Sequence, residues 1–172
     1  ETKKEQWLEQ RRKFITGTDA AALLGISKWS SKLSVWLDKK GLSEPTFENE
    51  AMFWGKKLER SILERYAEVQ QCKLEFMDGY DLKTSEDYPQ LACSLDGWNH
   101  TLQCPVDAKN IRQRSSDWGE AGTDEIPSYY KTQLAVQMAI TGAQMAHLAV
   151  LFSGQEFKIY IVHRDEELIN KI

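Results

Sequence analysis

Asp107 and Lys109 are separated by one position in the segment Val-Asp-Ala-Lys. Side chains alternate along a strand, so residues two apart project from the same face. In a strand, the carboxylate and the ammonium would therefore enter one site. There the carboxylate could hold a hard cation, and the ammonium could activate a water or steady a phosphate. This spacing alone is more often a surface ion pair, so an assignment needs further carboxylates.

Asp96 is the second carboxylate that could join such a site. It follows an apolar segment and precedes Gly97, and the segment 98–103 is long enough for a turn that returns the next strand alongside. Two carboxylates on neighbouring strands could then share a metal ion. By itself, Asp-Gly indicates only a turn.

Glu59 is the third carboxylate, and helical periodicity places it on an apolar face. At about 100° per residue it falls within the arc that should be buried, whereas Glu64 and Glu68 fall outside it. A carboxylate that faces a core requires a partner, and both a metal ion and a buried Arg or Lys remain open. The arc is formed by Gly55, Leu58, Ile62, Leu63, Tyr66 and Val69.

Glu59, Asp96 and Asp107 together supply three negative charges, which one or two divalent cations and Lys109 would balance beside a phosphodiester. Metal-assisted hydrolysis requires this arrangement of charge, because one ion lowers the pKa of the attacking water and a second stabilises the leaving 3′ oxygen. Oxygen ligands with a lysine and no histidine favour Mg²⁺ over zinc, with Mn²⁺ as a substitute.

Composition is compatible with an enzyme of this kind. The 172 residues, 41% hydrophobic and 28% charged, suffice for one domain, which we expect to span 1–172. A net charge of −4 opposes binding of nucleic acid by charge alone, but acidic metal ligands contribute to that total. Basic residues gather near residues 3–13 and 109–114, and each group is equally compatible with DNA contact and with a solvated face.

Other classes of protein are disfavoured. No apolar stretch approaches the roughly 18 residues that cross a bilayer, and the first residues lack an apolar signal region. We therefore expect no membrane partner and a cytoplasmic location, in a bacterial or phage-infected host cytosol. Three cysteines without Cys-x-x-Cys spacing indicate reduced thiols, and the three histidines form no ligand pair.

The pattern of elements predicts helices before strands. Thr18 is the expected N-cap of a short second helix that ends at Gly25. Helices are expected at Lys4–Phe14, Asp19–Leu24, Ser31–Lys40, Phe47–Val69 and Pro127–Thr141, with a closing helix from Arg164.

Period-two patterns follow the longest helical stretch. The last two strands should form a hairpin through a turn at Gln155. An α/β or α+β domain with a mixed sheet is therefore predicted. Strands are expected at Lys73–Lys83, Leu91–Ser94, Pro105–Lys109, Ala146–Phe152 and Phe157–His163.

Several short motifs occur in the order and spacing of a known family. The chain resembles the YqaJ-type viral recombinase nucleases, the phage lambda exonuclease family, within the PD-(D/E)xK nuclease superfamily. The resemblance extends from Trp7 to at least Phe152. Its motifs are Trp7-x-x-x-Arg11, Ile15-Thr16-Gly17-Thr18, Gly55-x-x-x-Glu59, Ala92 to Gly97, Val106 to Lys109 and Tyr130-x-x-Gln133.

This resemblance implies a restriction-endonuclease-like core and a magnesium-dependent 5′-to-3′ exonuclease that degrades one strand of double-stranded DNA from its end. It also implies a homotrimer ring around the DNA, and products that pass to a single-strand annealing protein in recombination. Two alternatives stay open. One is an endonuclease of the same superfamily, and the other is a catalytically silent adaptor that binds DNA ends for an annealing protein.

The resemblance also implies roles for the acidic residues and the lysine. Asp96 and Asp107 would be metal ligands together with the carbonyl of Ala108, and Glu59 would complete the site. Lys109 would orient or deprotonate the water. Leu95 replaces a usual proline, and Asp107 stands where the family often has Glu, so a variant of reduced activity also stays open.

Four further residues receive roles from the resemblance. Gln133 matches the catalytic-site glutamine of the family, although an ordinary amphipathic helix would also place it there. Arg11, Thr18 and Ser94 fall where the family holds the 5′-terminal phosphate, and an arginine flanked by hydroxyls suits that dianion. The N-cap role of Thr18 is compatible with phosphate binding.

Overall fold

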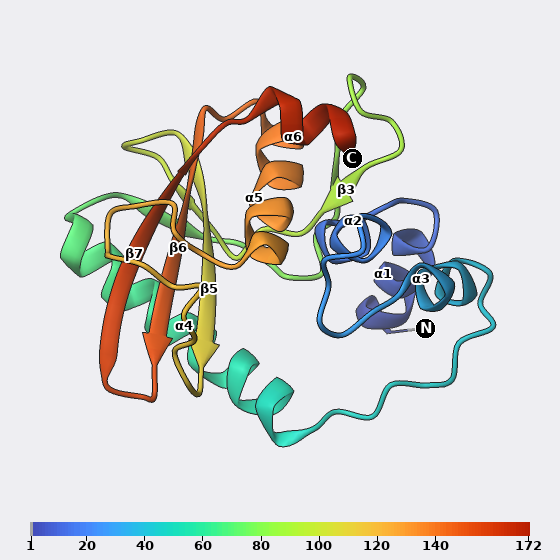
Figure 1. Ribbon diagram of the computed structural model, residues 1–172, viewed down its shortest axis with the longest axis horizontal. Coiled ribbons are helices and arrows are strands. Elements are labelled where there is room, and N and C mark those ends of the chain that lie inside the picture. The colour runs from blue at the N-terminus through green and yellow to red at the C-terminus, as the bar shows by residue number, and fades with distance from the viewer. Residues whose placement is uncertain (1) are drawn as a thin grey trace.

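The computed structural model describes residues 2–172, which form six helices and seven strands (Figure 1). The N-terminal half is helical, and the strands follow α4. The helices are α1 (Lys3–Arg11), α2 (Gly17–Leu23), α3 (Lys32–Lys39), α4 (Glu50–Gln70), α5 (Ser128–Thr141) and α6 (Glu166–Lys171). The strands are β1 (Leu74–Phe76), β2 (Lys83–Thr84), β3 (Ala92–Cys93), β4 (Gly97–Asn99), β5 (Cys104–Ile111), β6 (Met145–Phe152) and β7 (Glu156–His163).

Five strands form one mixed sheet in the order β1-β4-β5-β6-β7. The β5–β6 pair is parallel and the other pairs are antiparallel, while β2 and β3 form a separate two-stranded ribbon. Parallel strands need a crossover, and α5 supplies it between β5 and β6. The predicted α+β domain with a mixed sheet is confirmed.

Helices α4 and α5 cover opposite faces of the sheet. Tyr66 and Leu63 of α4 pack in one cluster with Val106 and Ala108 of β5. Leu134 of α5 belongs to a second cluster that includes alternate residues of β6. Because side chains alternate along β5, Asp107 and Lys109 point away from the α4 cluster.

A buried polar bridge fixes α4 on the sheet. The Tyr66 hydroxyl lies 2.8 Å from Nδ1 of His147 on β6 and accepts a 2.8 Å hydrogen bond from Nδ2 of Asn99 on β4. All three residues are buried. A buried hydroxyl without partners would be costly, so this bridge favours one position of the helix. Glu59 lies two turns before Tyr66 on the same helix.

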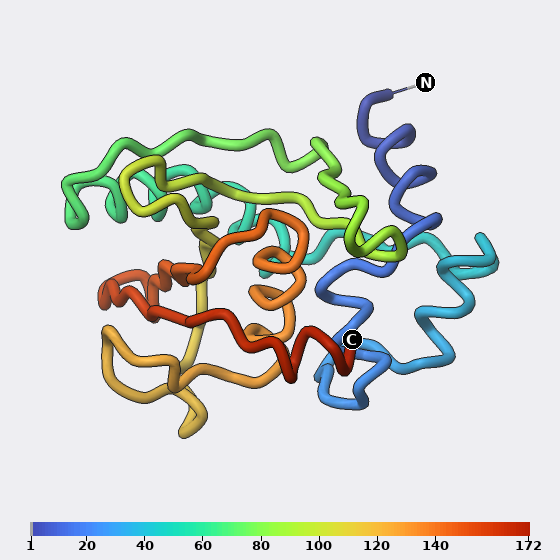
Figure 2. The backbone as a smooth tube through the Cα atoms, turned by 90° about the horizontal axis from the view of Figure 1, so that it is seen from above, coloured from blue at the N-terminus to red at the C-terminus, as the bar shows by residue number. Residues whose placement is uncertain are grey.

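Helices α1, α2 and α3 lie beside the sheet layer, and α5 stands between them and strands β5, β6 and β7 (Figures 1 and 2). Gly17 opens α2 at its contact with α5. A Cβ atom at Gly17 would lie 2.8 Å from Cα of Gln133. Only glycine permits this approach of the two backbones.

Several predicted boundaries are wrong. Thr16, not Thr18, is the N-cap of α2, because the carboxylate of Asp19 accepts hydrogen bonds from the amide and hydroxyl of Thr16. The strand expected at 73–83 is two short strands, β1 and β2, separated by a turn. Strand β4 was expected as a turn; it pairs with both β1 and β5.

Other elements match their predictions. Gly25 ends the second helix with a φ of +75°, and β6 and β7 form the expected hairpin. Among residues 2–172, no helix combines the length and apolarity needed to span a bilayer.

Candidate active site

Strand β5 carries an aspartate and a lysine at the centre of the site. Asp107 is 2% exposed, and its Oδ1 accepts a 3.0 Å hydrogen bond from Nε2 of Gln137 on α5. Nζ of Lys109 lies 2.7 Å from Oδ2 of the same carboxylate. The predicted placement of Asp107 and Lys109 on one face of a strand is therefore observed.

Asp96 joins the site because the pairing of β4 with β5 stops early. The register runs from Asn99 with Cys104 to Gly97 with Val106 and ends there. The next residue on the β4 side is Asp96, whose Oδ2 accepts a 2.9 Å hydrogen bond from the Ala108 amide. A carboxylate thus replaces the strand as acceptor, which brings Asp96 against β5.

Glu59 approaches this group from α4. Its side chain is half-buried, and burial together with the Asp107 carboxylate raises its pKa. Burial and the Asp107 carboxylate likewise raise the pKa of Asp96 well above the usual value. The negative charge of Asp107 therefore disfavours the charged forms of both Glu59 and Asp96.

The same negative charges favour the charged form of Lys109. Burial alone would lower the pKa of Lys109, but the carboxylates of Asp107 and Asp96 outweigh it and raise the pKa. The side chain also lies 5.4 Å from the ring centroid of Tyr130. Lys109 is therefore an ammonium at neutral pH, suited to donate hydrogen bonds.

The negative charge of the site is incompletely balanced by the protein. Across residues 2–172, no three Asp, Glu, His or Cys side chains stand close enough together to enclose a metal ion. Oδ2 of Asp107 has Lys109 Nζ beside it, but Oε1 of Gln137 is buried and no donor among residues 2–172 hydrogen-bonds it. The raised pKa values of Glu59 and Asp96 and this unpartnered oxygen suit a hard divalent cation.

A cavity of about 220 Å³ adjoins the acidic group. Ser94, next to β3, accepts a 3.1 Å hydrogen bond from the Trp7 indole and so links α1 to the wall. Thr18 reaches the cavity from the exposed side of α2. The cavity is lined by Trp7, Arg11, Thr16, Gly17, Thr18, Leu82, Cys93, Ser94, Asp96, Gln133 and Gln137.

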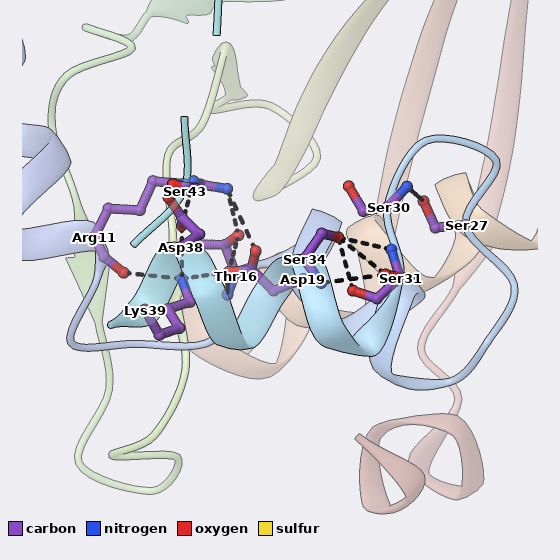
Figure 3. Close-up of polar contacts among 10 residues, drawn as sticks. All are labelled: Arg11, Thr16, Asp19, Ser27, Ser30, Ser31, Ser34, Asp38, Lys39 and Ser43. Carbon is purple, nitrogen blue, oxygen red and sulfur yellow. Dashed lines mark hydrogen bonds and ion pairs between the residues drawn. The ribbon is translucent and has the colours of Figure 1, made fainter. Parts of the chain in front are cut away.

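Arg11 is held in this wall by a network of charges (Figure 3). Its Nη2 donates to Thr16 Oγ1 at 3.0 Å and lies 3.7 Å from Asp19 Oδ1. Asp19 also receives Nζ of Lys39 at 2.6 Å. Burial alone would raise the pKa of Asp19, but Lys39 and Arg11 outweigh it and lower the pKa. This network fixes the position of the Arg11 guanidinium in the cavity wall.

The structure thus brings the predicted site residues into two adjoining groups. Glu59, Asp107 and Lys109 surround the acidic centre, with Ala108 between the last two. The cavity beside it is lined by Arg11, Thr18, Ser94 and Gln133, and Asp96 belongs to both groups.

Gln137, Asp19 and Lys39 escaped prediction as site residues. The spacing of Gln133 and Gln137, one helical turn apart, was the available signal for Gln137. Nothing in the sequence joins Asp19 to Lys39.

Comparison with known proteins identifies the family of the chain. Residues 6–144 match the model of the YqaJ-like viral recombinase domain. The chain belongs to this family. The YqaJ-like chain is 31% identical over 182 residues to the protein YqaJ of Bacillus subtilis (strain 168), which is described as uncharacterized. The match covers 100% of this chain and 54% of that protein, so the chain spans about half the length of its curated relative.

Solved structures share the fold of this YqaJ-like chain. The alkaline exonuclease LHK-Exo of Laribacter hongkongensis superimposes with a TM-score of 0.72 at 17% identity, over 97% of this chain and 86% of that one. A phage-related exonuclease of Haemophilus somnus 129PT gives a TM-score of 0.64 at 15% identity, over 92% and 87% of the two chains. The predicted family and fold class are confirmed.

Proposed function

We propose that this YqaJ-like chain is a magnesium-dependent exonuclease that degrades one strand of double-stranded DNA in the 5′-to-3′ direction from its end. One observation carries the proposal: three electrostatically linked carboxylates and an ammonium adjoin a cavity walled by an arginine and three hydroxyl side chains. Membership of a recombinase family and a fold shared with exonucleases support it.

Glu59, Asp96, Asp107 and the carbonyl of Ala108 would hold the cation, with Mn²⁺ able to replace Mg²⁺. When bound, a hard cation lowers the pKa of an attacking water and stabilises the leaving oxygen. The protein supplies the rest. Gln137 fixes the Asp107 carboxylate through Oδ1, while Oδ2 of that group lies 2.7 Å from Lys109 Nζ.

Lys109 would donate hydrogen bonds to the attacking water or to the phosphate. Its raised pKa keeps the side chain protonated, so orientation by the ammonium is favoured over removal of a proton. Tyr130 limits the movement of the ammonium from one side. Gln133, on the cavity wall, would contact the same phosphate or water.

Arg11, Thr18 and Ser94 would bind the 5′-terminal phosphate in the cavity. An arginine forms strong charge-assisted hydrogen bonds with a phosphate dianion, and hydroxyls supply further donors. Because Asp96 lies on the shared wall, a terminal phosphate held there would place a neighbouring phosphodiester near the carboxylates. This arrangement favours cleavage at ends over internal cleavage.

A linear duplex labelled at its ends tests activity, polarity and strand choice together. With magnesium, we expect degradation from 5′-phosphorylated ends, no loss of a closed circle, and no reaction in EDTA. Rapid linearisation of the circle would instead indicate an endonuclease of the same superfamily. Binding of ends without any hydrolysis in magnesium or manganese would indicate an end-binding adaptor.

The proposal extends to a homotrimer ring and to a single-strand annealing protein that receives the product. Segment 42–54 carries large apolar side chains that are exposed in the single chain, as a subunit contact would require. Light scattering should give three times the mass of one chain. A monomer at micromolar concentration would remove the ring from the proposal and leave the cleavage chemistry unaffected. Exposed apolar residues of this segment are Leu42, Phe47, Met52, Phe53 and Trp54.

A further inference from the structure

Trp29 is an exposed aromatic residue held in a defined turn. It lies between α2 and α3, and its side chain is 65% exposed. Oγ of Ser27 accepts hydrogen bonds from the amides of Trp29 at 3.2 Å and Ser30 at 3.1 Å; Figure 3 shows Ser27 and Ser30 at this turn. The backbone is therefore fixed while the indole ring faces solvent.

The indole rests against a second aromatic ring. The Trp29 and Tyr129 ring centroids are 4.9 Å apart with an interplanar angle of 77°, an edge contact. Nζ of Lys28 lies 5.3 Å from the Tyr129 ring centroid. An edge contact supports the indole from one side, which leaves much of its surface free. We call Lys28, Trp29 and Tyr129 the Trp29 platform.

Helix α5 connects this platform with the active site. Tyr129, Gln133 and Gln137 are spaced four residues apart and therefore form one ridge along the helix. Tyr129 contacts Trp29, Gln133 lines the cavity, and Gln137 bonds Asp107.

A second route of contact reaches the same place. The Tyr129 and Tyr130 ring centroids are 4.6 Å apart, and the Tyr130 ring centroid is 5.4 Å from Lys109 Nζ. The platform thus stands one residue beyond the catalytic lysine's aromatic neighbour.

We propose that the Trp29 platform stacks an unpaired nucleobase of the DNA strand whose phosphate occupies the active site. The inference rests on the proposed function. Aromatic faces bind bases without regard to sequence, and a nearby cation binds the adjoining phosphate. The platform offers both, with Lys28 as the cation. An exposed tryptophan that served only to bind protein would need neither the lysine nor the continuous ridge to the cavity.

Binding to two matched DNA ends tests the proposal. One substrate is a 5′-phosphorylated duplex with a short unpaired 5′ end, and the other has abasic nucleotides in that unpaired segment. Fluorescence anisotropy in EDTA measures affinity without hydrolysis. We expect Trp29→Ala to weaken binding of the intact end about 5-fold to 100-fold, the range for one lost base stack. Trp29→Phe should retain most of the affinity.

The abasic end separates stacking from other effects. The wild-type protein should lose as much affinity on the abasic end as Trp29→Ala loses on the intact end, and the variant should not distinguish the two ends. Trp36→Ala is the matched control, because Trp36 is 52% exposed on α3. It should bind both ends like the wild type.

Three results would overturn the inference. The first is wild-type affinity of Trp29→Ala for the intact end, and the second is an equal loss by the variant on both ends. The third is a change of assembled mass by light scattering with DNA affinity unchanged, which would assign Trp29 to a subunit contact. Failure of the wild type to bind or cleave any duplex end would instead refute the proposed function.

Discussion

Asp19 and Asp96 are two shielded carboxylates in opposite electrostatic surroundings. Asp19, beside the cavity wall, has Lys39 at 2.6 Å and Arg11 at 3.7 Å, and its pKa is lowered. Asp96 has one backbone donor, and the charge of Lys109 favours its ionised form, but burial and the Asp107 and Glu59 carboxylates outweigh these and raise its pKa. The first carboxylate is satisfied within the fold, whereas the second is left with charge that a ligand must balance. This difference in electrostatic surroundings distinguishes Asp19, which supports the fold, from Asp96, which belongs to the proposed active site.

The largest effect is expected at the one ammonium of the acidic centre. Lys109→Ala should lower the cleavage rate at least about 100-fold, because a positioned donor to the reacting group is lost. DNA binding should be kept, since Arg11 and the cavity are unchanged. Initial rates on a 5′-phosphorylated duplex measure the loss.

Lys158→Ala is the matched control for that experiment. The Lys158 side chain is 15% exposed, against 22% for Lys109, and lies 3.2 Å from Glu156. It should cleave like the wild type. Unchanged turnover in Lys109→Ala would refute the catalytic role of this lysine.

Magnesium should distinguish the two carboxylates by stability. A ligand that binds only the folded state at 100 times its Kd raises the unfolding free energy by about 2.7 kcal/mol. We expect this rise in the wild type and in Asp19→Asn, and a much smaller rise in Asp96→Asn. Urea unfolding with and without magnesium is the measurement. An equal rise in all three proteins would show that the cation binds elsewhere.

Loss of the satisfied carboxylate should weaken the fold. Asp19→Asn removes the ion pair with Lys39 and leaves Arg11 and Lys39, both largely shielded, with only the more distant Asp38 carboxylate at 3.9 and 4.0 Å. We expect a loss of about 1–3 kcal/mol in the unfolding free energy, typical of a broken charged hydrogen bond. Metal-free urea unfolding measures it. Asp38→Asn is a control, because Asp38 lies 3.9 Å from Arg11 and is more exposed; a loss there as large as in Asp19→Asn would contradict the assignment.

The smallest effect is the pH dependence, which should have opposite signs at the two sites. The raised pKa of Asp96 means that its contribution to stability is fully present below about pH 4 and is lost as pH rises through the raised value. The lowered pKa of Asp19 means that its contribution is present above about pH 4 and is lost as pH falls through the lowered value.

Urea unfolding in EDTA at several pH values tests these signs. Asp96→Asn should gain stability relative to the wild type as pH rises above about 4. The stability deficit of Asp19→Asn should shrink as pH falls below about 4. Parallel pH profiles for the two variants would contradict the electrostatic contrast.

Local patterns in the sequence predicted the helices and the β6–β7 hairpin because their signals are local. The apolar arc of α4 correctly separated Glu59 from the exposed Glu64 and Glu68, but it wrongly included Val69, which is 47% exposed near the end of the helix. Strand β4 has no such signal, since Asp96-Gly97 is typical of a turn. Its three residues become a strand only through pairing with β1 and β5, which lie on either side.

The same limit applies to the site. Alternation along β5 predicted that Asp107 and Lys109 lie side by side. The resemblance of the motifs to those of the family predicted that Asp96 and Glu59 lie near them. The N-cap of α2 was misplaced because Thr16 and Thr18 are both capable caps, and the choice depends on Asp19. That carboxylate is held by Lys39, 20 residues later, in an ion pair that no spacing rule predicts.

The contact of Gly17 with Gln133 limits how far apart α2 and α5 lie at the cavity. Both residues line it, and a Cβ atom at position 17 would lie 2.8 Å from Cα and 2.9 Å from Cγ of Gln133. Because a backbone atom is among these neighbours, rotation of the Gln133 side chain alone could not make room for a larger residue, and α2 would have to move away from α5. The width of the cavity between these two helices therefore depends on the absence of a side chain at position 17.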